Sequence, residues 1–170
     1  MTPEYFRVCA NISLDAIRDN IKSGRALLPA GTKMMGVVKA DAYGHGAVPV
    51  AKAIEDLVEV YGVSMPEEGV ELRKAGLTKP IVILGYTAPE VAELAIRYDI
   101  TMAVFQSEIA EKYNEIAKNL NKKAKVHIKL DTGMSRIGVR TKEEAQRLTR
   151  LIDSLAHVEL TGCFTHMATA

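Results

Sequence analysis

The sequence predicts an α/β protein whose strands form a parallel (β/α) barrel of the TIM type, incomplete because only about six of the eight βα units are present. Short apolar runs rich in β-branched residues alternate with amphipathic helical patterns along the whole chain. Most of these runs are apolar on both faces, which is typical of parallel strands covered by helices. Polar side chains follow the runs directly, as expected at the carboxyl ends of such strands.

The first predicted element is an amphipathic helix from about Ser13 through Leu28. Its apolar face contains Leu14, Ile17 and Ile21. From there the chain alternates between strand and helix. Strands are predicted at residues 34–38, 58–63, 81–84, 100–105, 126–130 and 159–164.

Three helices between these strands are predicted to begin with a capping box of the S/T-x-x-E type. The boxes start at Ser64, Thr87 and Thr141, and the first two have proline in the first turn. Gly76 stands where the cap at the carboxyl end of one helix is expected. Apolar residues recur at helical spacing in three sets: Val50, Ile54, Leu57 and Val58; Ile109, Tyr113, Ile116 and Leu120; and Leu148, Leu151, Ile152 and Leu155.

An open, doubly wound parallel sheet is the competing architecture. No G-x-G-x-x-G follows the first strand, which weakens the dinucleotide-binding version of that sheet. A complete barrel needs well over about 200 residues, whereas this chain has 170 and stops in FTHMATA, directly after a strand. We therefore expect an unfinished barrel.

Composition limits the classes of function. The chain is 48% hydrophobic and 25% charged with a net charge of +1, and its charges of opposite sign are interspersed. Neither nucleic acid nor a membrane is the expected partner, and the absence of a signal-like start favours the cytoplasm. Cys9 and Cys163 are expected to be reduced core cysteines, and no cluster of residues has the spacing of a metal site. The partner should be a small molecule or another protein.

Lys39 is the sharpest candidate because it ends a strand among apolar neighbours, where desolvation frees an amine to condense with a carbonyl. A side chain that snorkels to the surface is the alternative. In the following loop, Tyr43 could be a packing aromatic, while Gly44 and Gly46 suit a turn with positive φ. His45 is expected to bond nearby backbone.

The second candidate stretch is KLDTGMSRIG, residues 129–138. Alternation with His127 points Lys129 inward, and a buried lysine needs a partner or must lose its charge. Asp131 is too close along the strand to face Lys129 easily, so a salt bridge inside the barrel and a surface role for Arg136 stay open. The other residues noted at strand ends are Gly85, Tyr86, Phe105, Gln106, Thr165 and His166. If the sheet curls into a barrel, these residues converge on one rim with Lys39, Lys129 and Arg136.

The stretches VVKADAYGHG, KLDTGMSRIG and FTHMATA, in this order and spacing, resemble those of bacterial alanine racemase. The resemblance covers essentially the whole chain but only the front part of the family's protein. It implies a fold-type III barrel that binds pyridoxal 5'-phosphate, with residues 1–170 as its amino-terminal portion and the carboxyl-terminal β domain absent from this chain.

The resemblance also implies a role for each matched residue. Lys39 looks like the Schiff-base lysine and the base that exchanges the α-proton of the D-isomer, and Tyr43 looks like a phosphate ligand. Arg136 resembles the residue that binds the cofactor's phenolic oxygen and the substrate carboxylate. Lys129 resembles a lysine carried as a carbamate that orients this arginine, and His166 looks like a ring placed against the pyridine.

The implied activity is the interconversion of L-alanine and D-alanine for peptidoglycan synthesis. In this family the opposite base comes from the carboxyl-terminal domain of the second subunit of a homodimer, so we expect the chain alone to be inactive. Two alternatives stay open: a barrel that binds pyridoxal phosphate without racemising, as in homeostasis-type proteins, and a structural fragment that associates through its unpaired edges.

Overall fold

The computed structural model describes residues 8–169, so residues 1–7 and 170 of the predicted domain lie outside the described part of the chain. Two three-stranded parallel sheets have the orders β1-β2-β3 and β4-β5-β6. A parallel bridge joins them, in which Ile83 N donates to Thr101 O at 2.8 Å and Thr101 N to Ile81 O at 2.9 Å. The strands are Met35–Val37 (β1), Val60–Val63 (β2), Ile81–Ile83 (β3), Met102–Val104 (β4), Ala124–Leu130 (β5) and Val158–Thr165 (β6).

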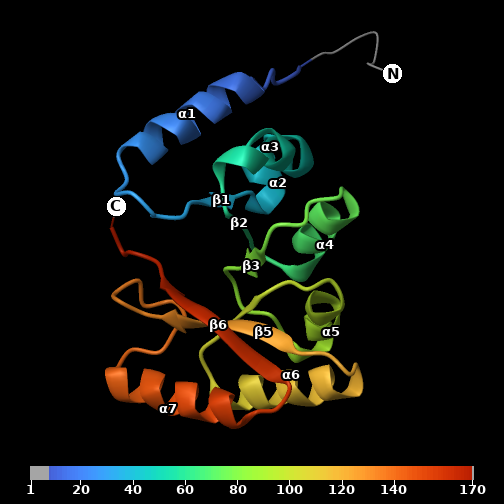
Figure 1. Ribbon diagram of the computed structural model, residues 1–170, viewed down its shortest axis with the longest axis vertical. Coiled ribbons are helices and arrows are strands. Elements are labelled where there is room, and N and C mark those ends of the chain that lie inside the picture. Colours follow the sequence, from blue (N-terminus) through green and yellow to red (C-terminus); the bar gives the residue numbers. More distant parts are fainter. Residues whose placement is uncertain (1–7, 170) are drawn as a thin grey trace.

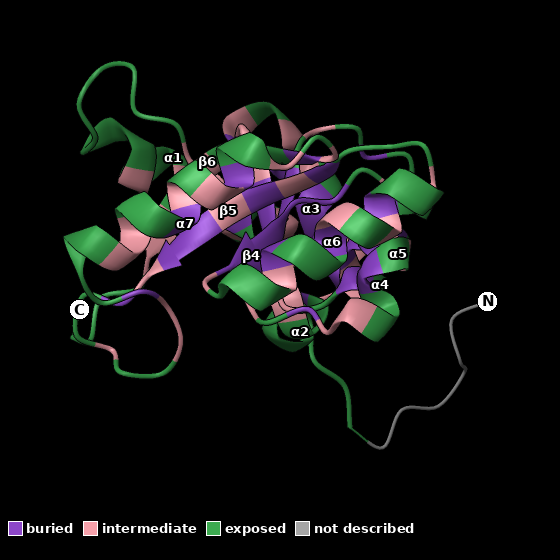
Figure 2. Cartoon of the chain, turned by 90° about the horizontal axis from the view of Figure 1, so that it is seen from below, coloured by how far each residue is buried: buried purple, intermediate pink, exposed green. Residues whose placement is uncertain are grey.

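Because these strands lie side by side in sequence order, the strand order never reverses, as it would in a doubly wound sheet. The incomplete parallel barrel is confirmed. Its helices cover the outer side of the strands (Figure 1), and buried residues gather on the strands and on the inner faces of the helices (Figure 2). The helices are Leu14–Ala26 (α1), Lys39–Gly44 (α2), Ala47–Ala53 (α3), Glu55–Leu57 (a 3₁₀ turn, η1), Pro66–Lys74 (α4), Pro89–Arg97 (α5), Ser107–Asn119 (α6) and Lys142–Ser154 (α7). Within residues 8–169, no helix is long and apolar enough to cross a bilayer.

The predicted capping boxes are correct in one case of three. Thr141 accepts from Glu144 N at 3.1 Å, and the Glu144 carboxylate accepts from Thr141 N. In α4 and α5 the proline occupies the first helical position, so the caps are Met65 and Ala88, one residue later than predicted. The acidic residue of each predicted box therefore falls at the second helical position, which is too early for a box.

Other boundaries depart from the sequence pattern more mildly. The single helix expected through Val58 ends at Ala53 and continues as η1, and Val58 is already extended because the chain turns there into β2. Gly76 is confirmed as the residue after the cap of α4, with a φ of 91°, where the following Leu77 N donates to Leu72 O at 3.1 Å.

Both cysteines are free, but their predicted place in the core is wrong. Cys9 precedes α1 and is exposed. Cys163 is exposed because it lies on the outer face of β6, beyond a β-bulge that changes which residues face inward.

The loop 131–138 folds back on the end of β5. Val139 N donates to Lys129 O at 3.0 Å and Asp131 N donates to Val139 O at 2.8 Å, which closes the loop. Gly138 makes this closure possible because its φ is 128° and a Cβ there would lie 2.7 Å from Asp131 N. The position of Arg136 within the loop thus depends on a glycine.

Helix α1 packs the partly buried Leu14, Ile17 and Ile21 of its predicted apolar face against the core, although none of its residues is fully buried. Ion pairs add to this attachment. Arg18 binds Asp56 at 2.5 Å, and Arg25 binds Glu59 at 2.7 Å. The hydrogen bond from Arg18 lowers the pKa of Asp56 to about 2. The hydrogen bond from Arg25, with a second from Met34 N, lowers the pKa of Glu59 to about 2.

We predict that acid releases α1 before the rest of the barrel. Both carboxyl groups have pKa values below their ordinary 3.8 and 4.5, so their stabilising contribution is present above about pH 4.5 and is lost as the pH falls toward 2. Amide hydrogen exchange, corrected for intrinsic rates, should show protection falling in α1 over this range while α7 stays protected. Equal loss in α1 and α7, or no loss in α1, would contradict the prediction.

We also predict that Gly138→Ala destabilises the chain. Strain of this kind costs about 1–3 kcal/mol, which corresponds to a fall in melting temperature of about 2–4 °C for each kcal/mol in a chain of this size. Thermal unfolding followed by circular dichroism measures it. The matched control is Gly24→Ala in α1, where a Cβ meets nothing closer than Met34 Cε at 3.9 Å. If the two variants melt alike, Gly138 is not required.

Candidate functional site

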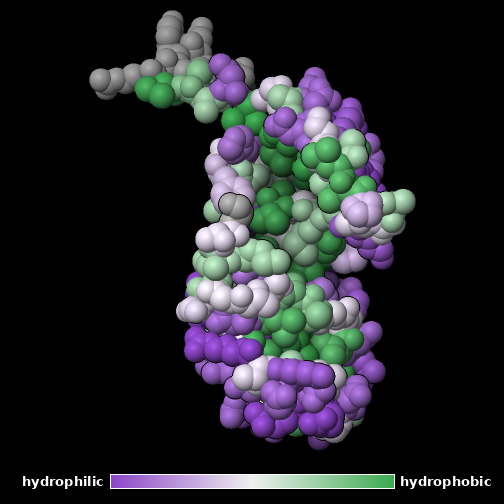
Figure 3. Space-filling view, turned by 90° about the vertical axis from the view of Figure 1, so that its left-hand side faces the viewer, coloured by the Kyte–Doolittle hydropathy of each residue, from purple (hydrophilic) through white to green (hydrophobic). Residues whose placement is uncertain are grey.

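A cavity of about 540 Å³ lies at the carboxyl ends of the strands. Apolar side chains gather in a hollow on the open side of the molecule (Figure 3). The cavity's polar lining includes Lys39, Lys129, Arg136 and His166, and none of the described residues that line it is acidic. Its other lining residues are Met35, Val37, Ser64, Leu84, Gly85, Tyr86, Ile137, Phe164 and Thr165.

Lys39 is presented to this cavity by the end of β1. The preceding Val38 N donates to Gly62 O of β2 at 2.9 Å, so the strand is still paired there. The next four residues, 40–43, have φ values of 51–55° and form a left-handed helical turn where a loop was predicted. Left-handed backbone costs about 1–2 kcal/mol per non-glycine residue, so this turn needs support from its surroundings.

Local hydrogen bonds supply part of that support. The Asp41 carboxylate accepts from Ala47 N at 2.6 Å, which ties the turn to the start of α3. His45 Nδ1 lies 2.9 Å from the carbonyl oxygen three residues before it, as predicted for a residue bonded to nearby backbone. Gly44 and Gly46 have φ values of 83° and 90°, which confirms their predicted role.

The structure places Tyr43 beside Lys39 but outside the lining of the cavity. The tyrosine is 62% exposed, and the Lys39 Nζ lies 5.9 Å from its ring centroid. Lys39 itself is half-buried rather than extended into solvent. Lys39 thus borders the cavity at its edge, and Tyr43 lies outside the lining beside it. Partial burial is compatible both with an amine directed into the cavity and with the snorkelling alternative.

Lys129 is buried at 2% exposure. Its Nζ donates to Leu130 O at 2.6 Å and lies 5.5 Å from the centroid of the Phe164 ring. Burial lowers the pKa of Lys129, the charge of Asp131 raises it, and the charge of Arg136 lowers it further. Among the described residues no carboxylate forms an ion pair with Lys129, so the structure does not support the alternative of a salt bridge inside the barrel.

The Asp131 carboxylate instead forms hydrogen bonds within and just after its own loop, residues 131–138. Its carboxylate accepts from Ser135 N at 2.8 Å, from Gly133 N at 3.2 Å and from Arg140 Nε at 3.2 Å. These bonds hold the pKa of Asp131 below its usual value, with the Ser135 amide the largest cause. Arg140 was missed by sequence reasoning because nothing in the pattern relates it to Asp131, nine residues earlier.

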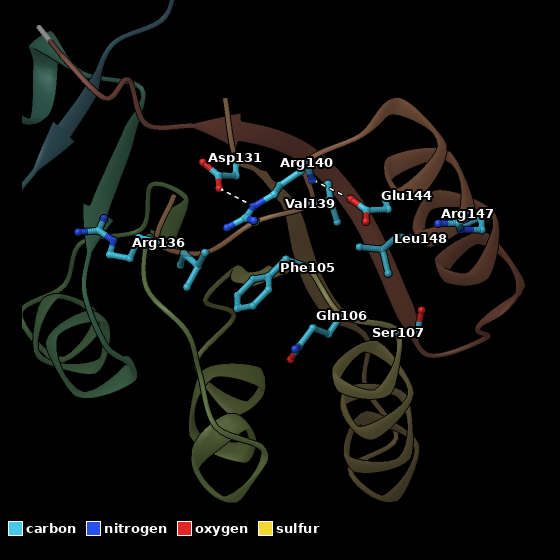
Figure 4. A pocket seen from close by; sticks show the side chains of 12 residues that line it. Phe105, Gln106, Ser107, Asp131, Arg136, Val139, Arg140, Glu144, Arg147 and Leu148 are labelled. Carbon is cyan, nitrogen blue, oxygen red and sulfur yellow. Dashed lines mark hydrogen bonds and ion pairs between the residues drawn. The ribbon is translucent and has the colours of Figure 1, made fainter. Parts of the chain in front are cut away.

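A second cavity, of about 420 Å³, lies on the other side of this loop and is drawn in Figure 4. Phe105 and Gln106 line it, so they do not join the first cavity as predicted for a single rim. Arg136 borders both cavities, and in Figure 4 its side chain points away from the Asp131–Arg140 pair. The Arg136 guanidinium is therefore not bonded to Asp131, and it remains available to a ligand in the first cavity.

A β-bulge decides which residues of β6 face the cavity. Leu160 pairs with Val126, but His127 pairs with Gly162, so one residue of β6 is extra. The shift brings Phe164 and His166 into the lining of the cavity. A Cβ at Gly162 would lie 2.9 Å from His127 Nε2, so the glycine leaves room for the imidazole ring in its present position.

Comparison with known proteins agrees with this geometry. A family model described as alanine racemase, N-terminal domain, matches residues 12–170. Alanine racemase 1 of Oceanobacillus iheyensis is 42% identical over 167 residues, which cover 98% of this chain and 44% of that protein. The structure of alanine racemase from Clostridium difficile 630 in complex with cycloserine has a TM-score of 0.87 at 48% identity, over 92% of this chain and 43% of that one.

A histidine racemase from Leuconostoc mesenteroides has a similar barrel, with a TM-score of 0.85 at 28% identity over 92% of this chain and 42% of that one. The chain spans less than half, 41% to 44%, of the length of the curated relatives it matches. The family model for the N-terminal domain, by contrast, matches nearly all of this chain, residues 12–170. The chain belongs to the alanine racemase family, within the family's N-terminal domain.

Proposed function

We propose that residues 1–170 form the amino-terminal part of the pyridoxal-phosphate barrel of an alanine racemase. The whole protein would be a cytoplasmic homodimer that interconverts L-alanine and D-alanine for peptidoglycan synthesis. The observation that carries the proposal is that Lys39, Lys129, Arg136 and His166, from three separate strand ends, line one cavity. The family assignment supports the same reading.

The cavity suits the cofactor in size and charge. Its volume of about 540 Å³ lies within the range of small-molecule sites, roughly 300–1,000 Å³. Lysine and arginine side chains line it without an acidic residue among its described lining, which favours an anionic ligand such as a phosphate or a carboxylate. Bound there, pyridoxal phosphate supplies an electron sink that acidifies the α-carbon of an attached amino acid.

We assign roles to the chain's own residues on this basis. The Lys39 amine anchors the cofactor and removes or returns the α-proton of the D-isomer. Arg136 offers planar guanidinium donors to the cofactor's phenolic oxygen and the substrate carboxylate. His166 lies against the ring, and Tyr43, on the rim beside Lys39, binds the phosphate.

We further propose that Lys129 carries a carbamate. Burial already lowers the pKa of Lys129, which increases the fraction of neutral amine that can react with carbon dioxide. The amine nitrogen forms a bond to carbon and releases one proton to solvent, so the product is an anion. An unpaired buried cation would thus become a partner for Arg136. This change would resolve the absence of an ion pair for Lys129 among the described residues.

We predict that pyridoxal phosphate attaches to Lys39. Borohydride reduction followed by intact mass and peptide mapping should find one phosphopyridoxyl group per chain, on Lys39. Lys39→Ala should lose it, while Lys52→Ala, which removes an exposed lysine of α3, should keep it. Label spread over surface lysines in the unsubstituted chain would refute the proposed site.

We predict that the isolated chain with cofactor exchanges the α-proton of D-alanine in deuterated water but racemises it far more slowly than a full-length relative. A second base on the opposite face is expected from a segment beyond this chain, and loss of one acid–base group costs about 100- to 10,000-fold in rate. Proton NMR and chiral analysis of the alanine measure both outcomes. Racemisation at the rate of a full-length relative would contradict this division of the site.

The same experiment separates the alternatives. Bound cofactor with no α-proton exchange from any amino acid would favour a barrel that does not racemise. Faster exchange of D-histidine than of D-alanine would favour the substrate named for the Leuconostoc mesenteroides relative.

A further inference from the structure

Glu68 joins two strand ends through one carboxylate. Its Oε1 accepts from Ala40 N at 2.8 Å, and its Oε2 accepts from Ser64 N at 2.6 Å. Glu68 lies in the first turn of α4 and is half-buried. Ala40 follows Lys39 directly, and Ser64 follows β2 and lines the cavity. Because a hydrogen bond from a backbone amide to a carboxylate is charge-assisted, both contacts are of the stronger kind.

The bond to Ala40 completes the anchoring of the backbone around Lys39. On one side, Val38 N donates to Gly62 O of β2 at 2.9 Å. On the other side, Ala40 N is held by Glu68 at the residue where the left-handed turn begins. With both flanking amides fixed to neighbouring elements, the direction in which the Lys39 side chain leaves the backbone is restricted.

The bond to Ser64, which follows β2, also affects the end of β3, because Ser64 contacts Gly85 there. The carbonyl oxygen of Ser64 packs so closely on Gly85 that a Cβ there would lie 2.9 Å from it. Gly85 and the adjacent Tyr86 both line the cavity. One carboxylate thereby joins the chain that follows β1 to the chain that follows β2, and Ser64, which it holds, in turn contacts Gly85 after β3.

We propose that Glu68 is a positioning residue for Lys39. It holds the strained left-handed turn and thereby aims the lysine amine into the cavity. The inference deepens the proposed function and rests on it for the identity of the cofactor. The contacts of Glu68, however, can be tested without any ligand.

The neighbouring Glu67 provides a matched control. It has the same charge and lies in the same turn, but it is exposed and borders a groove between α4 and α5, together with Lys74 and Leu94. Comparing Glu68→Ala with Glu67→Ala separates the bridging contact from a general effect of charge on α4. Glu68→Gln is the graded variant, because an amide keeps one acceptor oxygen for two backbone donors.

The first measurement is amide hydrogen exchange of the apo chain by NMR. Glu68→Ala should speed exchange at Ala40 and Ser64 by about tenfold or more, since each loses a charge-assisted bond. Glu68→Gln should lie between Glu68→Ala and the unsubstituted chain, and Glu67→Ala should match the unsubstituted chain. Unchanged exchange at Ala40 in Glu68→Ala would overturn the inference, whether or not the cofactor binds.

The second measurement is cofactor attachment. Glu68→Ala should attach pyridoxal phosphate to Lys39 about tenfold more slowly and show a weaker circular dichroism signal per bound cofactor, with Glu68→Gln intermediate. A purely structural residue would lower the melting temperature without changing that signal per bound cofactor. An unchanged attachment rate and signal in Glu68→Ala would overturn the positioning role. If the unsubstituted chain fails to attach cofactor, the proposed function fails, while amide exchange still decides whether Glu68 holds the turn.

Discussion

The arrangement of the cavity depends on the left-handed turn that follows Lys39. An α/β barrel normally passes from strand to helix through an ordinary loop, but here four non-glycine residues adopt φ values of 51–55°. Such a turn is unfavourable in isolation, so it persists only where its surroundings hold it. Asp41, the flanking glycines and Glu68 provide that hold. The lysine therefore leaves the strand at a fixed point instead of following a mobile loop.

Charge is the second constraint on this end of the barrel. Lys129 is buried with no carboxylate paired to it among the described residues, which is a costly arrangement in a protein interior. Asp131, whose charge raises the pKa of Lys129, already accepts from two backbone amides and Arg140 within its own loop. Within residues 8–169, neither the buried Lys129 nor the exposed Arg136 is paired with a carboxylate, and both side chains border the cavity. Such a site gains stability when an anion enters it or when Lys129 itself becomes anionic.

The sequence predicted the barrel, the order of its strands and the convergence of Lys39, Lys129, Arg136 and His166, because apolar periodicity and strand-end position are local signals. It could not predict features that depend on contacts between distant segments. The bulge that turns His166 into the cavity is visible only in the pairing of β6 with β5. Likewise, the pattern that begins at Ser64 predicts a cap on α4, whereas in the structure the acid that follows this pattern, Glu68, binds the amides of Ser64 and of the distant Ala40.

The contacts of Glu68 show how acidic side chains hold the loops at the carboxyl ends of the strands. Pro66 occupies the first position of α4, so Glu68 falls at the third and reaches back to Ser64 N and across to Ala40 N. Backbone amides take the same kind of partner elsewhere on this rim: Asp41 accepts from the start of α3, and Asp131 accepts within its own loop. The acids near the strand ends are therefore bound to backbone, and the described lining of the cavity holds lysine and arginine without them. Binding of these carboxylates to backbone amides therefore has two effects. It satisfies the hydrogen-bond donors of irregular loops, and it keeps the acids out of the described lining of the cavity, which stays positively charged.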